Sequence, residues 1–285
     1  MKMADREMQR TIIEPNGHNF QYWKDIWRYR ELAFNFAKRD VTVRYKQTKV
    51  GLGWAVINPV VNMIIMTFIF SGVANLSSEP GVPYAVMVYS GLIPWELLSK
   101  AIIGGAGTFI NNAAIMQKVY FPRILSPLGS CLAYLIDTFI SFAVLLILIV
   151  IFYFTQGFVP SLRIFLAPFV LVWALMLGLS AGLFLSAFNV KWRDLNQALP
   201  FLISIGQYIS PVGYSVNQNF GDKWWLPIYC LNPAVGILEL FKWCIIDSMK
   251  LNVFAVIVSV VWTVILVPLG IKLFRKTERT FVDIV

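Results

Sequence analysis

The sequence predicts an all-α integral membrane protein with six transmembrane helices, and three observations support this fold class. Hydrophobic residues make up 58% and charged residues only 14% of the 285-residue chain, whereas soluble domains typically carry about 25% charged residues. Apolar residues gather in runs of about 20, the length that a helix needs to cross a bilayer core of about 30 Å. These runs recur almost to the C-terminus, so we expect one membrane domain without a separate soluble domain.

Residues 1–21 are polar and charged, which predicts a cytoplasmic tail and no signal peptide. Residues 22–50 are predicted to form an amphipathic interface helix and a linker. At helical spacing, one face of this helix is apolar and aromatic: Tyr22, Ile26, Tyr29, Ala33 and Phe36. Lys and Arg residues lie among them, as expected beside anionic lipid headgroups. Two roles stay open: a plain membrane anchor, or an anchor that also forms part of a docking surface for a cytoplasmic partner.

The transmembrane domain is predicted over residues 51–273, followed by a cytoplasmic C-terminal tail over 274–285. Its six apolar runs are Leu52–Ala74, Tyr84–Ile103, Ser126–Phe154, Phe165–Phe188, Ala198–Tyr214 and Asn252–Leu273. The third run is long enough to tilt in the bilayer.

The stretch between the fifth and sixth runs, Trp224–Ile246, is only moderately apolar. Proline and asparagine interrupt it, and charges lie near its end. This pattern favours a re-entrant or interfacial pair of short periplasmic helices over a full crossing. The residues that mark this segment are Trp224, Trp225, Asn232, Pro233 and Glu239.

The distribution of basic residues predicts the orientation. Twenty of the 24 Lys and Arg residues lie before the first run, at the end of the second run or in the loop after it, in the loop after the fourth run, or in the tail. By the positive-inside rule both termini are cytoplasmic. The net charge of +9 therefore reflects topology, and no soluble basic face remains to bind nucleic acid.

The sequence lacks the motifs of several kinds of chemistry. It contains no phosphate-binding P-loop, no zinc-protease motif and no hydrolase nucleophile motif. His18 is the only histidine, and the three cysteines show no metal-ligand spacing. We therefore predict no catalytic, cofactor-binding or metal-binding residue in this chain, and no enzymatic activity of its own.

Two acidic residues lie inside apolar runs. Glu96 and Lys100 are four residues apart, the spacing of a local ion pair on one helix. Asp137 is predicted to accept hydrogen bonds within the helix bundle, and Ser130, Thr138 and Ser141 lie near it in sequence. Proton transfer by Asp137 stays open as an alternative, because acids inside a membrane often have a transport role.

The chain is rich in aromatic residues, with 22 Phe, 11 Tyr and 10 Trp. Most are expected to face lipid or to form belts at the membrane interfaces. Some of them would also suit a flat wall along which the C–H face of a sugar slides. The candidates for such a wall are Phe68, Phe70, Tyr84, Tyr89, Tyr208 and Tyr214.

Seven motifs occur along the chain in a fixed order. They are Val43–Thr48 with Gly51–Ala55 and Asn58-Pro59, then Gly91–Trp95, Lys118–Arg123, Asn189–Asp194, Ser210–Val212, Asn232-Pro233 and Arg275–Phe281. From about residue 20 to the end, the chain resembles the ABC-2 transporter permeases that export O-antigen, capsule or teichoic acid polymers. The resemblance implies a bacterial inner membrane, but it does not select one polymer.

The resemblance implies partners. Two copies of the chain would pair and bind two copies of a separate nucleotide-binding subunit, which would hold ATP and Mg. A polymer on a polyprenyl-pyrophosphate lipid would pass between the two permeases. The loop after the second helix would dock on the ATPase, and its candidate residues are Asn111, Asn112, Gln117, Lys118, Tyr120, Phe121 and Arg123. The periplasmic re-entrant helices of the family would correspond to Trp224–Ile246.

Two further sets of residues are candidates for contact with the cargo. Basic residues before the first run are suited to attract a pyrophosphate headgroup: Arg44, Lys46 and Lys49. Alternatively, they only obey the positive-inside rule. The proposed channel lining consists of Asn58, Asn62, Phe68, Ser204, Gln207, Tyr208, Ser210 and Tyr214. Two other functions stay open: an ABC-2 permease for another lipid or a drug, and a membrane-embedded glycan-modifying transferase.

Overall fold

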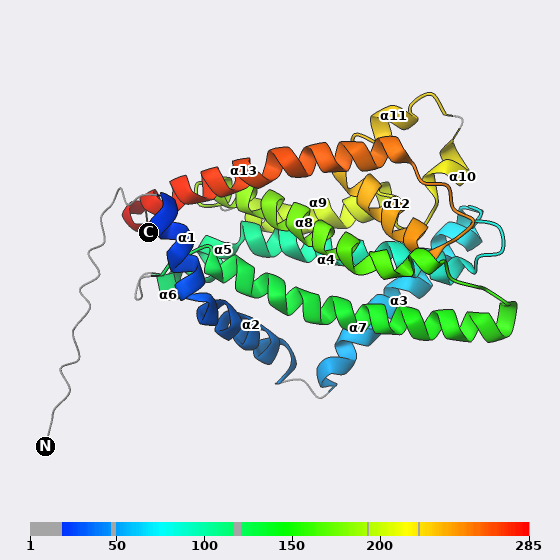
Figure 1. The fold of residues 1–285 in the computed structure, drawn as a ribbon, viewed down its shortest axis with the longest axis horizontal. Helices are drawn as coiled ribbons and strands as arrows, with labels where there is room; N and C mark the ends of the chain where they lie inside the picture. The colour runs from blue at the N-terminus through cyan, green and yellow to red at the C-terminus, as the bar shows by residue number, and fades with distance from the viewer. Residues whose placement is uncertain (1–18, 47–49, 117–120, 193, 222, 285) are drawn as a thin grey trace, which may run out of the picture.

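The computed structural model describes residues 19–46, 50–116, 121–192, 194–221 and 223–284. Within these ranges every regular element is helical, and the long helices run side by side (Figure 1). Five segments are long and apolar enough to cross a membrane: Trp54–Val73, Tyr84–Ala106, Leu125–Gln156, Leu162–Asn189 and Val253–Arg279. They correspond to the first, second, third, fourth and sixth predicted runs. The chain is therefore an all-helical, multi-pass membrane protein.

The fifth predicted run forms a shorter helix than expected. Helix α9 covers Leu195–Ile209, and its 15 residues correspond to about 22 Å, less than a bilayer core of about 30 Å. The helix ends where Ser210 is extended, with ψ 155°, because the residue before a proline avoids the helical region. A sixth crossing therefore stays a prediction.

Helix α4 (Tyr84–Ala106) forms the centre of the bundle and is buried along most of its length. It packs against α3 (Trp54–Thr67), α7 (Leu125–Gln156), α8 (Ala167–Asn189) and α12 (Pro233–Ile245). The contact with α8 is close because small residues line it. A Cβ added at Gly182 would lie 2.8 Å from the backbone oxygen of Ala101.

Short helices follow α9: α10 (Val216–Phe220), α11 (Leu226–Tyr229) and α12. Asn232 caps α12, since its side-chain oxygen accepts a 3.0 Å hydrogen bond from the Ala234 backbone, and Pro233 occupies the first turn. The predicted break of this region into short helices matches the structure. Their re-entrant position in the bilayer stays a prediction.

One end of the bundle, here called the termini end, gathers both ends of the described chain (Figure 1). It contains α1 (Asn19–Arg28), α2 (Arg30–Tyr45), α5 (Thr108–Asn111), α6 (Ala113–Met116) and the last turns of α13. Helix α13 runs as one element over Val253–Ile284. We call the other end of the bundle the far end.

The predicted N-terminal amphipathic helix differs from the structure in two respects. It is two helices, and the chain turns between them at Tyr29, where φ is −96° and ψ is 18°. Its predicted apolar face does not point to lipid, because all of its members pack in a cluster with Phe109, Phe121 and Phe274. The aromatic residues on the exposed side of the two helices are instead Trp23, Trp27 and Phe34, with Trp27 72% exposed.

Candidate functional site

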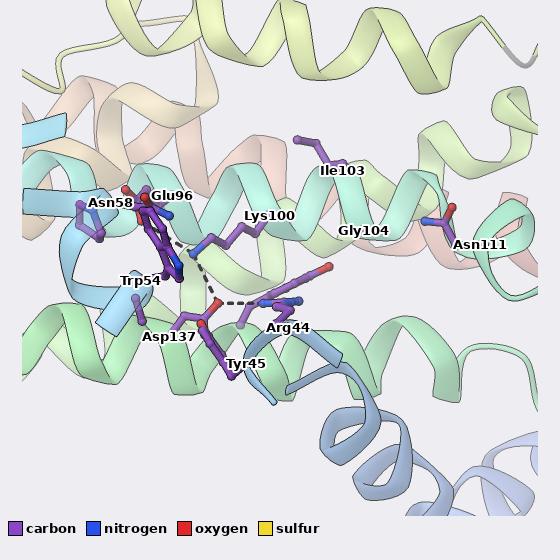
Figure 2. Close-up of a pocket in the computed structure, with 13 residues that line it drawn as sticks. Arg44, Tyr45, Trp54, Asn58, Glu96, Lys100, Ile103, Gly104, Asn111 and Asp137 are labelled. Atoms are coloured by element: carbon purple, nitrogen blue, oxygen red, sulfur yellow. Dashed lines mark hydrogen bonds and ion pairs between the residues drawn. The ribbon is translucent and has the colours of Figure 1, made fainter. Parts of the chain in front are cut away.

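A polar cavity of about 590 Å³ lies among α2, α3, α4, α5 and α7 (Figure 2). It combines charged side chains with aromatic and amide groups, and it opens to the surface, since Trp54, Asn58 and Asn111 are exposed. Its lining consists of Arg44, Tyr45, Trp54, Ala55, Asn58, Pro59, Glu96, Lys100, Ile103, Gly104, Asn111, Tyr134 and Asp137. Because five helices contribute, only tertiary packing brings these residues together.

The Asp137 carboxylate on α7 is the centre of this cavity. One of its oxygens accepts a 2.6 Å hydrogen bond from the Tyr45 hydroxyl. The other accepts a 2.8 Å bond from the Arg44 guanidinium and lies 3.5 Å from the Lys100 ammonium (Figure 2). Asp137 is only 4% exposed, and a buried carboxylate is stable only when it is paired and hydrogen-bonded. The prediction that Asp137 accepts hydrogen bonds within the bundle is confirmed.

The donors to Asp137 are not the residues near it in sequence. The hydroxyl of Thr138 donates to a backbone oxygen on its own helix, and Ser130 donates to Asp40. The two short hydrogen bonds come from Arg44 and Tyr45 at the end of α2, about 90 residues earlier in the chain, and the longer contact comes from Lys100 on α4. Burial, followed by the hydrogen bond to Asp137, raises the pKa of Tyr45 to about 12. The Tyr45 hydroxyl therefore stays protonated and donates at neutral pH.

The charges in the cavity balance. Lys100 lies 3.8 Å from Glu96, one helical turn earlier, which confirms the predicted local ion pair. Arg44 also stacks over the ring of Tyr134 at 4.9 Å, a favourable cation–π arrangement. With two cations, two carboxylates and the amides of Asn58 and Asn111, the cavity offers both donors and acceptors. It suits a polar, hydroxyl- or phosphate-bearing group that exchanges with the ion pairs already present.

The structure separates the three residues predicted to attract a headgroup. Arg44 lines the cavity, whereas Lys46 follows the last residue of α2 and is exposed. Lys49 lies outside the described residues. Lys100 was not in the predicted set, although its place beside an acid inside an apolar run was visible in the sequence. The headgroup role stays a prediction.

The predicted channel residues fall into two groups. Those on α3, on the helical turn after it and on α9 are at least partly accessible: Asn58, Asn62, Phe68, Ser204, Gln207 and Tyr208. Ser210 and Tyr214 are buried instead. Ser210 accepts a 3.2 Å hydrogen bond from Asn232, and the Tyr214 hydroxyl lies 2.8 Å from that of Tyr229. These two side chains fasten the segment after α9 to α11 and α12, so they do not form an open wall in this chain.

A buried ion pair holds this same segment. The Lys242 ammonium donates to Glu239 at 2.7 Å and to the backbone oxygens of Pro211 and Tyr214 at 2.8 and 2.6 Å. Both charged side chains are fully buried. Of the other predicted residues of this region, Trp224 is 84% exposed and Trp225 is half-buried. Glu239 and Lys242 are close in the sequence. The sequence did not show that Lys242 also donates to the backbone of the segment after α9.

The predicted docking loop begins with α5 and α6. Asn111 is exposed, whereas Asn112 and Phe121 are buried. Arg39 donates to the Asn112 side chain at 2.9 Å, and Phe121 packs on the ring of Phe36 at 5.6 Å. The side chains of Asn112 and Phe121 therefore support the loop from inside.

Arg123, at the end of the loop, is half-buried and contacts Glu278. Gln117, Lys118 and Tyr120 lie outside the described residues. The docking role of the loop is not tested by these contacts and stays a prediction. Among the described residues, no three His, Cys, Asp or Glu side chains gather where they would hold a metal ion.

Comparison with known proteins gives a consistent result. The family described as "ABC-2 type transporter" matches residues 32–246. An O-antigen export system permease protein of Klebsiella pneumoniae is 26% identical over 255 residues, which are 89% of this chain and 95% of the relative. A protein of the same description from Myxococcus xanthus is 25% identical over 77% of this chain and 82% of its own length. A polysialic acid transport protein of Escherichia coli is 23% identical over 85% of this chain and 91% of its own length.

Proposed function

Since this chain belongs to the ABC-2 type transporter family, we propose that it is the membrane-spanning permease of an ABC transporter that exports a polysaccharide linked to a polyprenyl-pyrophosphate lipid. The observation that carries the export function is the similarity, over most of the chain, to permeases of O-antigen and polysialic acid export. The resemblance seen in the sequence motifs supports the lipid-linked form of the cargo.

ATP hydrolysis takes place in a separate nucleotide-binding subunit. The sequence has no P-loop, so the chain depends on a partner for energy. That partner docks at the termini end, on the exposed side of α5 and α6. The termini end therefore faces the cytoplasm of a bacterial inner membrane, in agreement with the basic residues in the N-terminal segment and around the adjacent loops.

A second copy of the chain completes the path for the polymer. Helix α9 has no buried residue, although it carries Phe201, Leu202 and Tyr208, which are 66%, 57% and 49% exposed. On α3 and the helical turn after it, Ile64 and Phe68 are 58% and 68% exposed. These faces mix apolar and polar side chains, among them Asn58, Ser204 and Gln207. Such faces suit a contact between two copies and a polar path between them better than lipid.

The polar cavity receives the headgroup of the cargo. Arg44 and Lys100 in its lining, with Lys46 just after Arg44, provide the positive charge that meets the pyrophosphate. The pyrophosphate takes the place of Asp137 as the acceptor of hydrogen bonds from Arg44 and Lys100. Charge-assisted hydrogen bonds of this kind are the strongest that proteins make to phosphate.

Deletion and complementation in cells tests the function. Surface glycan and lipid-linked polymer are measured together in a deletion strain. Export predicts that surface polymer disappears, that lipid-linked polymer accumulates inside, and that this chain with its ATPase restores export. A deletion strain that never makes the polymer would favour a transferase, and unchanged glycan would indicate another cargo.

A further inference from the structure

The loop between α4 and α7 is held by parts of the chain that are not its neighbours in sequence. Without other contacts, the loop would be held only by its backbone connections to α4 and α7. In the structure α1, α2 and the end of α13 also contact it, at the termini end of the bundle (Figure 1). We call the contact formed by Tyr22, Arg123, Arg275 and Glu278 the Glu278 junction.

Glu278 on α13 binds two other segments at once. One of its carboxylate oxygens accepts a 2.8 Å hydrogen bond from the Arg123 backbone N–H, and the other accepts a 3.0 Å bond from the Tyr22 hydroxyl. In return, the Arg123 guanidinium donates to the Glu278 backbone oxygen at 2.6 Å. Arg275, one turn earlier on α13, stacks over the Tyr22 ring at 4.5 Å.

Aromatic contacts reinforce the same arrangement independently. Phe109 on α5 stacks on Phe274 of α13, with ring centroids 4.7 Å apart and an interplanar angle of 22°. Phe274 is fully buried and Phe109 is 1% exposed. Both ends of the loop, at Phe109 and at Arg123, are therefore fixed to one short stretch of α13.

We propose that the Glu278 junction transmits movement of the ATPase-facing loop to α13 and to the N-terminal helix, with Glu278 as a positioning residue for ATP-driven export. This inference rests on the proposed function, since it assigns a role to the loop that the ATPase would contact. Packed helices and buried hydrogen-bond networks move as units, so a loop fixed at both ends carries them with it. A force on the loop then reaches the membrane-spanning helix α13 directly, in addition to the flanking helices α4 and α7.

The test compares variants of the full chain in complex with its nucleotide-binding subunit. Glu278→Ala removes both side-chain acceptors, and Tyr22→Phe removes one donor without changing the shape of the ring. Glu278→Gln keeps one acceptor oxygen for the Arg123 N–H. The control is Glu31→Ala, which removes an exposed acid from the first turn of α2. For each variant we would measure assembly of the complex, ATP hydrolysis, polymer export and hydrogen exchange of residues 108–125.

The expected result is loss of coupling with an intact complex. Glu278→Ala lowers the ratio of export to ATP hydrolysis by about 2- to 30-fold, the range of measured coupling effects, and speeds exchange at the Arg123 amide. Glu278→Gln and Tyr22→Phe have smaller effects in the same direction, and Glu31→Ala has none. An unchanged ratio and unchanged exchange in Glu278→Ala would refute the inference. So would loss of ATPase binding, because Glu278 would then belong to the docking surface.

The two proposals fail in different ways. Wild-type protein that neither binds an ATPase nor exports polymer would refute the proposed function, and the coupling role with it. Wild-type export with an unaltered ratio in Glu278→Ala and Tyr22→Phe would refute the coupling role alone. Because Tyr22→Phe is a conservative change, it decides the matter even where Glu278→Ala does not fold.

Discussion

Replacement of Lys242 by methionine removes the cation that joins α12 to the chain segment after α9. In the structure its ammonium group makes three hydrogen bonds of 2.6–2.8 Å, to Glu239 and to the backbone oxygens of Pro211 and Tyr214. Neither Lys242 nor Glu239 has any exposed side-chain surface. The second carboxylate oxygen of Glu239 has no hydrogen-bond partner among the described residues. Lys242→Met therefore leaves a buried carboxylate with no counter-charge.

The expected loss of folding stability depends on which buried polar groups lose their partner. Removal of one partner of a buried ion pair costs about 3–5 kcal/mol. The double variant Glu239→Leu with Lys242→Met removes both charges, and only the two backbone oxygens lose their donor. Unpaired buried polar groups cost about 1–3 kcal/mol each. Since replacement of a buried pair by apolar residues is itself neutral to favourable, we expect the double variant to be more stable than the single variant.

Thermal unfolding in detergent measures both variants. A thiol-reactive dye is a suitable probe because Cys131, Cys230 and Cys244 are free and buried, so they react only when the protein opens. The control is Lys250→Met, at an exposed lysine, which should unfold like wild type. Equal stability of the single and double variants, or a single variant as stable as the control, would refute the reasoning.

Three further predictions concern the bundle and the cavity. Gly182→Ala should destabilise the protein by about 1–3 kcal/mol in the same unfolding assay, since the added Cβ meets α4 backbone atoms at 2.8 Å; Gly72→Ala, with 3.6 Å of clearance, is the matched control. Gln207→Lys should slow export without change in expression or unfolding temperature, because it places a charge on the open face of α9; wild-type export would count against that face as part of the path. Asp137→Asn weakens the hold on Arg44, and faster proteolysis near the end of α2 should follow; unchanged cleavage would contradict the role of Asp137 as the anchor of α2.

Much of the membrane fold was predictable because bilayer physics acts on composition and length. Apolar runs of about 20 residues have few alternatives in hydrocarbon, where every backbone group needs an internal partner. Five of the six predicted runs are helices long enough to cross. The fifth ended early at Ser210, since Pro211 interrupts the helix. Pro211 is visible in the sequence, but the predicted run was extended past it to Tyr214 because apolar residues lie on both sides of it.

Pairing of polar residues was less predictable. The sequence showed Glu96 with Lys100 because helix geometry places residues four apart side by side. It did not show Tyr45 and Arg44 with Asp137, or Glu278 with Tyr22 and Arg123. Nor did it show that the apolar face from Tyr22 to Phe36 packs on protein, because lipid and a protein core select the same side chains.

The sequence by itself determined the class of the protein, the positions of its long helices, the lack of an ATP-binding motif and the family. These depend on local composition and on ordered motifs, which can be read along the chain. Tertiary structure alone decided which charges on different helices meet, which aromatic residues are covered, and which helices fasten the loop between α4 and α7. The physical reason is that a buried charge or hydrogen-bonding group needs a partner within about 3 Å, and the donors to Asp137 and Glu278 come from segments that are distant in the sequence.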